Sequence, residues 1–373
     1  SATWEQVQKV TPVTGYDNDS FGENIAIDGE WMVVGAESHD LYHAGIGLRT
    51  DAGAAFVYHW NGATWEQTQK LYASDFEVGF AFGSSVAIEG TRMAVGCEGY
   101  TFYDGTKWTY DAGAVFVYDY NGSSWTLTDR LTTAVHENND FLGAAVALSG
   151  DMIIATAPGD DHTGFSDAGS AYVFEYDGAA WSETAMLTAT DADDYDYFGR
   201  TVDIDGDRIV IGCDNNDDAG DQSGCVYVFD WNGTEATWEE STKLTASDAA
   251  QGYYFGSSTA ISGDRIIVGS RNVNLYDGST IYRIGQAYLY EFDGVDWVET
   301  VFQSPNPTAS EYFGESVDIE GERFVVGATG TGVGQLNNVG AVYRFEYDGA
   351  VWDFSQMTAM DGYSGDDFGV DVC

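Results

Sequence analysis

The chain has 373 residues, of which 44% are hydrophobic and 15% aromatic, so it can bury a large core. Its 61 acidic and 14 basic residues give a formal net charge of −47 at pH 7, which disfavours nucleic acid as a partner because phosphate binding needs clustered Lys and Arg. No apolar run approaches the roughly 20 residues that a membrane span requires, so we expect no membrane insertion.

The chain opens with residues 1–11, which include Trp4 and are predicted as a strand. From there it repeats one pattern, which begins with a Phe-Gly or Leu-Gly pair and a run of alternating apolar and polar residues typical of a strand. A short turn containing Gly and a second strand rich in β-branched residues follow, as in residues 262–270. The pair occurs at Phe21-Gly22, Phe82-Gly83, Leu142-Gly143, Phe198-Gly199, Phe255-Gly256, Phe313-Gly314 and Phe368-Gly369.

A third and a fourth strand complete each repeat. After a connection of variable length, a strand such as Gly113 to Tyr118 runs into an Asn-Gly or Asp-Gly pair, which is a strong signal for a tight hairpin. The fourth strand starts at a tryptophan, which we interpret as packing between neighbouring repeats rather than as a ligand-stacking residue. Each repeat is therefore predicted to be a four-stranded antiparallel meander.

Repeated meanders of this kind form the blades of a β-propeller, an all-β fold in which only short sheet edges stay exposed. The six complete repeats span residues 21–74, 82–134, 142–190, 198–247, 255–304 and 313–360. We expect residues 1–11 and 368–373 to be closing strands of a seventh blade, so that residues 1–373 form a single seven-bladed propeller. The second and third strands of the seventh blade are missing from this pattern. We favour a chain that continues past Cys373; the alternatives are a six-bladed ring with spare ends, and self-assembly in which a partner supplies the missing strands.

The repeat resembles the FG-GAP repeat family, which includes the propeller of integrin α-subunits. The likeness is clear where residues 243–248 (KLTASD) precede Phe255-Gly256, and it extends over essentially the whole chain. It implies an extracellular or cell-surface, secreted protein with a role in adhesion or recognition. The calcium-binding turns of integrin propellers cannot be carried over, because the corresponding turns are minimal here, as at Asp28-Gly29.

Long connections are predicted at one edge of every blade, after the second and fourth strands, and such loops on a rigid scaffold usually carry binding. They are rich in Asp and Asn, whose oxygens suit Ca²⁺; the alternative is that these are ordinary turn residues. The candidate Ca²⁺ ligands are Asp160, Asp161, Asp167, Asp191, Asp193, Asp196, Asp214, Asp217, Asp218 and Asp221.

Aromatic residues in the same connections are candidates for ligand binding, because their rings can stack on sugars. The candidates are Tyr100, Tyr103, Tyr195 and Tyr253; residues just before a Phe-Gly pair can equally pack within the blade. Cys213 and Cys225 are placed at equivalent ends of paired strands, so we predict a disulfide between them and an oxidising compartment.

Catalysis finds little support in the sequence. His39 and His43 are the only neighbouring histidines, and we interpret them as exposed loop residues rather than a metal pair. There is no Gly-x-Ser-x-Gly motif, no Cys-x-x-Cys motif and no phosphate-binding loop. We therefore predict a non-enzymatic extracellular propeller that recognises a protein or glycan through its loops. The alternatives are a structural subunit of an extracellular filament or coat, and a polysaccharide-acting enzyme.

Overall fold

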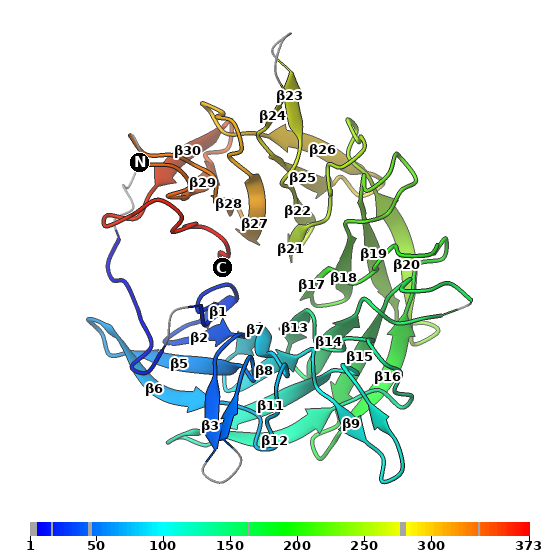
Figure 1. Ribbon diagram of the computed structural model, residues 1–373. Helices are drawn as coiled ribbons and strands as arrows, with labels where there is room; N and C mark the ends of the chain where they lie inside the picture. Colours follow the sequence, from blue (N-terminus) through cyan, green and yellow to red (C-terminus); the bar gives the residue numbers. More distant parts are fainter. Residues whose placement is uncertain (1–5, 16–17, 44–46, 163, 277–280, 335) are drawn as a thin grey trace. The chain divides into compact units, whose positions relative to one another are not determined.

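The computed structural model describes residues 6–15, 18–43, 47–162, 164–276, 281–334 and 336–373. Over these residues the strands form six four-stranded antiparallel sheets and three two-stranded sheets (Figure 1). The same residues contain no helix that is long and apolar enough to cross a membrane. The chain divides into two compact units, residues 8–202 and residues 203–373 together with 1–7.

The unit of residues 8–202 contains three four-stranded sheets, in which the strands follow one another in chain order. They are β1 (Ile25–Asp28), β2 (Trp31–Ala36), β5 (Ala54–Trp60) and β6 (Trp65–Leu71); β7 (Phe82–Glu89), β8 (Arg92–Cys97), β11 (Ala114–Tyr120) and β12 (Trp125–Leu131); and β13 (Val146–Ser149), β14 (Met152–Ala157), β15 (Ser170–Tyr176) and β16 (Trp181–Leu187). Two small hairpins are inserted between second and third strands: β3 (Leu41–His43) with β4 (Gly47–Arg49), and β9 (Phe102–Tyr103) with β10 (Trp108–Thr109).

The other unit is built in the same way, and the boundary between the units falls within β17. Its sheets are β17 (Thr201–Asp205), β18 (Arg208–Cys213), β19 (Cys225–Asn232) and β20 (Thr237–Leu244); β21 (Ser258–Ser262), β22 (Arg265–Ser270), β25 (Gln286–Phe292) and β26 (Trp297–Phe302); and β27 (Phe313–Glu320), β28 (Arg323–Ala328), β29 (Ala341–Tyr347) and β30 (Trp352–Met357). One hairpin, β23 (Asn274–Tyr276) with β24 (Ile281–Arg283), is inserted between β22 and β25.

The predicted all-β architecture of four-stranded propeller blades is confirmed, but the prediction of seven blades is wrong: the described residues form six. Residues 368–373 contain no strand, and Phe368 makes a single parallel bridge to Gly340. Residues 6–11 of the predicted N-terminal strand are also not a strand, because they lack a backbone ladder, and Trp4 lies outside the described residues. Self-assembly through the end of the chain, and a single domain over residues 1–373, stay predictions.

Apolar side chains from neighbouring sheets meet in the core of each unit. In residues 8–202, Val57, Met93 and Phe116 are buried in a cluster that includes Trp125. Trp125 is only 2% exposed and packs edge to face against Trp31 of the preceding sheet, at 5.4 Å between ring centroids. For this tryptophan the interpretation as packing between repeats is confirmed.

Neighbouring sheets are also joined through their backbones, and this contact explains the Phe-Gly pairs. The glycine before the third strand pairs with the Phe or Leu that opens the next repeat, for example Gly53 with Phe82 and Gly113 with Leu142. Gly113 has φ +79°, and a Cβ there would lie 2.2 Å from backbone atoms of Leu142. Only glycine lets the two chains approach this closely.

Candidate binding surface

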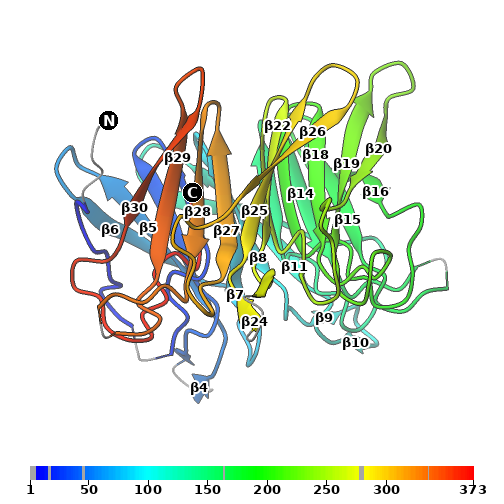
Figure 2. The same ribbon diagram turned by 90° about the horizontal axis from the view of Figure 1, so that it is seen from above.

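Every four-stranded sheet has two different edges. The turns after the first and third strands are short and define the turn edge, whereas the connections after the second and fourth strands define the loop edge. Figure 2 shows β9 and β10 at the loop edge of residues 8–202, and shows β24 at the loop edge of residues 203–373, away from the turn that joins β29 to β30. This arrangement follows because successive strands of a sheet run in opposite directions, so the turns after the first and third strands lie at one edge and the connections after the second and fourth lie at the other, as predicted from the sequence.

The three inserted hairpins extend the loop edge, and sequence reasoning treated them only as long loops. On β9 and β10 the rings of Tyr103 and Trp108 stack at 4.5 Å between centroids, although the residues are 48% and 53% exposed. Asp104 and Gly105 form the turn between them, and the Asp104 side chain accepts hydrogen bonds from the backbone. An Asp-Gly pair between Phe102-Tyr103 and Trp108-Thr109 is a hairpin signal that could have been found in the sequence.

The four candidate tyrosines have different environments. Tyr103 is exposed on β9, as described, and Tyr195 is 56% exposed. Tyr100 is buried instead, and its hydroxyl donates to Asp75 at 2.9 Å. Tyr253 is partly buried. Ligand stacking by Tyr100 would therefore require its ring to leave the core, whereas Tyr103 and Tyr195 are available at the surface.

Two of the three predicted Ca²⁺ ligands in the third repeat, Asp160 and Asp161, accept hydrogen bonds from the protein. The Asp160 carboxylate is buried and accepts bonds from the hydroxyls of Ser170 and Tyr172. Asp161 accepts a bond from the backbone N–H of Asp167 at 2.8 Å. Burial raises the pKa of the Asp167 carboxyl, as does the nearby charge of Asp161. These contacts occupy part of the acceptor capacity of Asp160 and Asp161 with donors from the protein itself.

The stretch from Asp191 to Asp196 forms a turn that its own carboxylates cap. Asp196 is 2% exposed and accepts a bond from the backbone N–H of Asp193 at 3.1 Å. Asp193 in turn accepts a bond from the N–H of Asp194 at 2.8 Å. Asp191 is exposed. The turn-forming alternative thus accounts for Asp193 and Asp196 in this structure.

The carboxylates of the fourth repeat are separated in a similar way. Asp218 forms an ion pair with Lys243, and Asp221 accepts a bond from the Gln251 amide at 3.0 Å. Asp214 is buried. The three carboxylates therefore differ in burial and in the partners that the structure gives them.

Asp217, the last candidate ligand, is exposed. Within the part of the chain that the structure describes, no three His, Cys, Asp or Glu side chains come together as a metal-binding group. The structure therefore does not bring the predicted ligands together, and Ca²⁺ binding stays a prediction.

Cys213 and Cys225 lie directly opposite each other at the ends of β18 and β19, and both are fully buried. Directly opposed residues on antiparallel strands have Cα atoms about 4.5 to 5.5 Å apart, which is within the range of a disulfide. No disulfide joins them in the structure, so the bond itself stays a prediction.

We expect Cys213 and Cys225 to resist alkylation in the unfolded protein until a reductant is added, as peptide mass mapping would show. The variant Cys225→Ser should expose Cys213 to alkylation without reductant and lower the free energy of unfolding by about 2 to 3 kcal/mol, because the bond closes a short loop. Alkylation of both cysteines in the unreduced wild-type protein would show that the prediction is wrong.

The interpretation of His39 as an exposed loop residue is wrong. His39 is 1% exposed, and its Nδ1 lies 2.7 Å from a carboxylate oxygen of Asp19, which is 6% exposed. The ammonium group of Lys70 approaches the other ring nitrogen, and burial lowers the pKa of this lysine. The buried contacts assign His39 a structural role beneath the loop edge. The side chain of His43 lies outside the described residues.

Glu37 and Glu98 each directly follow the second strand of a sheet, at the loop edge of residues 8–202, and the pKa of each carboxyl is raised. Burial and the nearby charges of Glu98 and Glu23 raise the pKa of Glu37 to about 7, against the opposing effect of Arg200. Burial also raises the pKa of Glu98. Glu37 is therefore partly protonated near neutral pH, so it repels Glu98 less than a full negative charge would.

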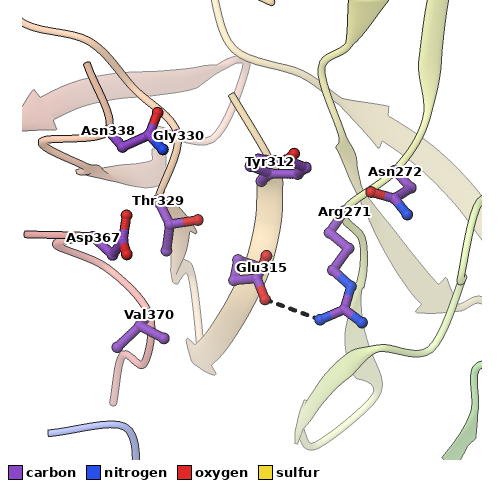
Figure 3. Close-up of a pocket in the computed structure, with 9 residues that line it drawn as sticks. All are labelled: Arg271, Asn272, Tyr312, Glu315, Thr329, Gly330, Asn338, Asp367 and Val370. Carbon is purple, nitrogen blue, oxygen red and sulfur yellow. Dashed lines mark hydrogen bonds and ion pairs between the residues drawn. The ribbon is translucent and has the colours of Figure 1, made fainter. Parts of the chain in front are cut away.

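A cavity of about 470 Å³ lies at the loop edge of the other unit, between β22, β27 and the segment before the C-terminus (Figure 3). Figure 3 shows Arg271 on one side, Thr329 and Asp367 on the other, and Glu315 between them. The Arg271 guanidinium pairs with Glu315 at 3.0 Å. Tyr312, which has φ +55°, adds an aromatic ring to the lining.

The chemistry of this cavity suits a polar ligand with hydroxyl or amide groups. Its lining offers donors and acceptors from Arg271, Asn338 and Thr329, beside the carboxylates of Glu315 and Asp367. Burial raises the pKa of Asp367, as does the neighbouring charge of Asp366. The one guanidinium and two carboxylates leave little or no attraction for an anion.

A family model described as FG-GAP repeat matches six segments, residues 4–58, 65–118, 125–174, 181–229, 238–290 and 302–345. No match was found among curated proteins. FG-GAP repeats are typical of extracellular or cell-surface proteins, and the propellers of the family are typically non-enzymatic. The matches cover most of the sequence, and each runs from before the first strand into the third strand of one four-stranded sheet. This chain therefore belongs to the FG-GAP repeat family.

Proposed function

We propose that this chain is a non-enzymatic binding domain of an extracellular or cell-surface protein, with a role in adhesion or recognition, and that it recognises a protein or glycan through its loop edge. The exposed stack of Tyr103 on Trp108 carries the proposal. Large aromatic rings held rigidly in water are costly, and they are enriched among the residues that dominate binding energy.

The cavity beside Arg271 supports the proposal, because it presents polar groups of both kinds beside an aromatic ring at the loop edge. We also propose that Ca²⁺ stiffens parts of the loop edge, which is supported by the Asp-rich and Asn-rich composition of its loops.

The experiment compares wild-type protein with the double variant Tyr103→Ser/Trp108→Ser on an array of extracellular glycans and matrix proteins, in Ca²⁺ and in chelator. We expect the wild type to bind at least one component, and the double variant to bind it about 30-fold more weakly, which corresponds to about 2 kcal/mol from two aromatic anchors. Weaker binding in chelator would support the role of Ca²⁺.

The matched control is Val295→Ser, because Val295 is 80% exposed at the turn edge. It should leave the affinity within about twofold of wild type, as expected for a substitution remote from the interface. Equal losses in the control and the double variant, or no binding by the wild type to any component, would contradict the proposal.

A further inference from the structure

Three of the junctions between neighbouring sheets share one ionic pattern at their turn edge, built on Arg92, Arg208 and Arg265, whereas the third sheet has Met152 at the arginine position. Arg92, the first residue of β8, pairs with Asp119 of its own sheet at 3.1 Å and with Asp151 of the next sheet at 2.8 Å. Its guanidinium also lies over the rings of Tyr176 and Trp181 of the next sheet, at 4.7 and 4.9 Å from their centroids. We call this arrangement the arginine clamp.

The clamp recurs elsewhere in the chain. Arg208, the first residue of β18, pairs with Asp230 at 2.7 Å and Asp264 at 3.3 Å, and it covers Phe292 and Trp297. In the next junction Arg265 makes the equivalent ion pairs, with Glu291 and Glu322 at 2.9 Å. Each of these three junctions therefore holds one cation between two carboxylates.

The junction between the first two sheets replaces all three charged groups. Trp31 stands where β8 and β18 have Arg92 and Arg208, and its register partner is His59 where theirs is an Asp. The turn residue of the next sheet is Thr91 in place of a carboxylate. The arginine and its two carboxylates are thus exchanged for an indole, an imidazole and a hydroxyl. The Nε2 atom of His59 lies 3.7 Å from a carboxylate oxygen of Glu30, in the adjoining turn.

This exchange coincides with a cavity of about 420 Å³. Trp31, His59 and Tyr120 supply rings to it, with Trp31 at 4.4 Å from His59 and 4.8 Å from Tyr120 between centroids. The hydroxyls of Thr68 and Ser123 and the amide of Gln69 contribute polar atoms. The volume and the mixture of aromatic walls with a few polar groups are those of a small-ligand site.

The walls of the cavity are held rigidly, which favours binding over collapse. The Gln69 side chain spans the two sheets: its Nε2 donates to the carbonyl of Trp125 at 2.8 Å, and its Oε1 accepts the N–H of Trp125 at 3.0 Å. Ser123 is fixed by hydrogen bonds to the Asn121 side chain. A preformed site of this kind loses little entropy when it binds.

We propose that this junction is a second binding site, at the turn edge, and that it takes an uncharged hexopyranose ring of a glycan. No Asp, Glu, Lys or Arg lines the cavity, and the one imidazole of the lining, His59, already lies 3.7 Å from the Glu30 carboxylate. The lining therefore offers no unpaired charge to an ionic ligand. The overall charge of −47 further opposes an anion. A sugar ring has an apolar face for Trp31 and Tyr120, and hydroxyls for Thr68 and Ser123.

The test uses glucose, galactose, mannose and N-acetylglucosamine as free probes, measured by saturation-transfer NMR with titration. We expect at least one of them to bind saturably to the wild type. The triple variant Trp31→Arg/His59→Asp/Thr91→Asp rebuilds the arginine clamp at this junction with residues that the chain already uses elsewhere, so it should fold and bind that sugar at least tenfold more weakly.

Two further variants keep the outcome clear. Ser123→Trp, at an exposed turn position, should block the cavity without disturbing the core and should weaken binding in the same way. Trp108→Ser, at the loop edge, should leave sugar binding at this junction unchanged, which separates this proposal from the proposed function. No saturable binding of any probe to the wild type, or binding that survives both Ser123→Trp and the clamp variant, would overturn the proposal.

Discussion

The variant Gly113→Ala is expected to lower the free energy of unfolding by more than about 3 kcal/mol. Its φ of +79° already strains any residue with a Cβ, and that atom would lie 2.2 Å from the backbone nitrogen and oxygen of Leu142. Because the obstacle is backbone, a side-chain rotation cannot relieve the clash. The second and third sheets would have to separate at the point where the Phe-Gly or Leu-Gly pair joins them. Equilibrium urea denaturation followed by circular dichroism measures the loss.

Gly122→Ala is the matched control, because Gly122 also has a positive φ, +90°, but no atom lies within 4 Å of the position that a Cβ would occupy. It should cost about 1 to 2 kcal/mol, which is the effect of the left-handed conformation alone. The difference between the two variants isolates the close approach of the two chains. Equal losses would show that this approach contributes nothing to stability.

The blades were predictable because their signals are local. Alternation of apolar and polar residues, the Asn-Gly turns and the tryptophans each act within a few positions, so the predicted third strand from Gly113 to Tyr118 nearly coincides with β11. The seventh blade was a wrong prediction for a related reason. Phe368 forms a backbone bridge with Gly340, as Phe82 does with Gly53 of the preceding repeat. This single bridge forms even though no strand follows Phe368. A Phe-Gly pair therefore predicts docking and does not by itself predict a blade.

The candidate site was less predictable, because it depends on distances across loops. Asp196 was predicted from the sequence as a Ca²⁺ ligand, yet its side chain is buried and accepts a hydrogen bond from the backbone of its own turn. Tyr100 reads as a loop aromatic, yet its ring is in the core. In contrast, Trp31 was visible in the sequence, where it stands at the position of Arg92, Arg208, Arg265 and Arg323 in other repeats. Comparison between repeats was the signal that could have indicated the turn-edge junction.

A carboxyl on an inner first strand provides a test of how this acidic protein responds to pH. Burial raises the pKa of Asp203 to about 7, although its oxygens accept backbone bonds from Ile261 at 2.7 Å and Ile204 at 2.8 Å, which oppose the rise. The nearby charge of Asp318 adds to it. Burial likewise raises the pKa of Asp318.

The variant Asp203→Asn should therefore change how stability depends on pH. Well below pH 4 the carboxyl is protonated in both the folded and the unfolded chain and makes no difference to stability. Between about pH 4 and pH 7 the unfolded chain releases its proton while the folded chain retains it, so the wild type loses stability as the pH rises. Above pH 7 the loss is complete and constant. The free energy of unfolding of Asp203→Asn, relative to wild type, should thus rise by on the order of 4 kcal/mol between pH 4 and pH 8.

Urea denaturation at a series of pH values measures this difference, and Asp296→Asn, at an exposed turn position, is the control because it should run parallel to wild type. The asparagine at position 203 can accept only through its carbonyl oxygen, so one of the two backbone donors loses its acceptor and the whole curve shifts down by about 1 kcal/mol. That shift does not depend on pH, and the slope between pH 4 and pH 7 is the diagnostic quantity. If the curves of Asp203→Asn and wild type are parallel, Asp203 titrates alike in the folded and unfolded chain, and burial on β17 does not hold its proton.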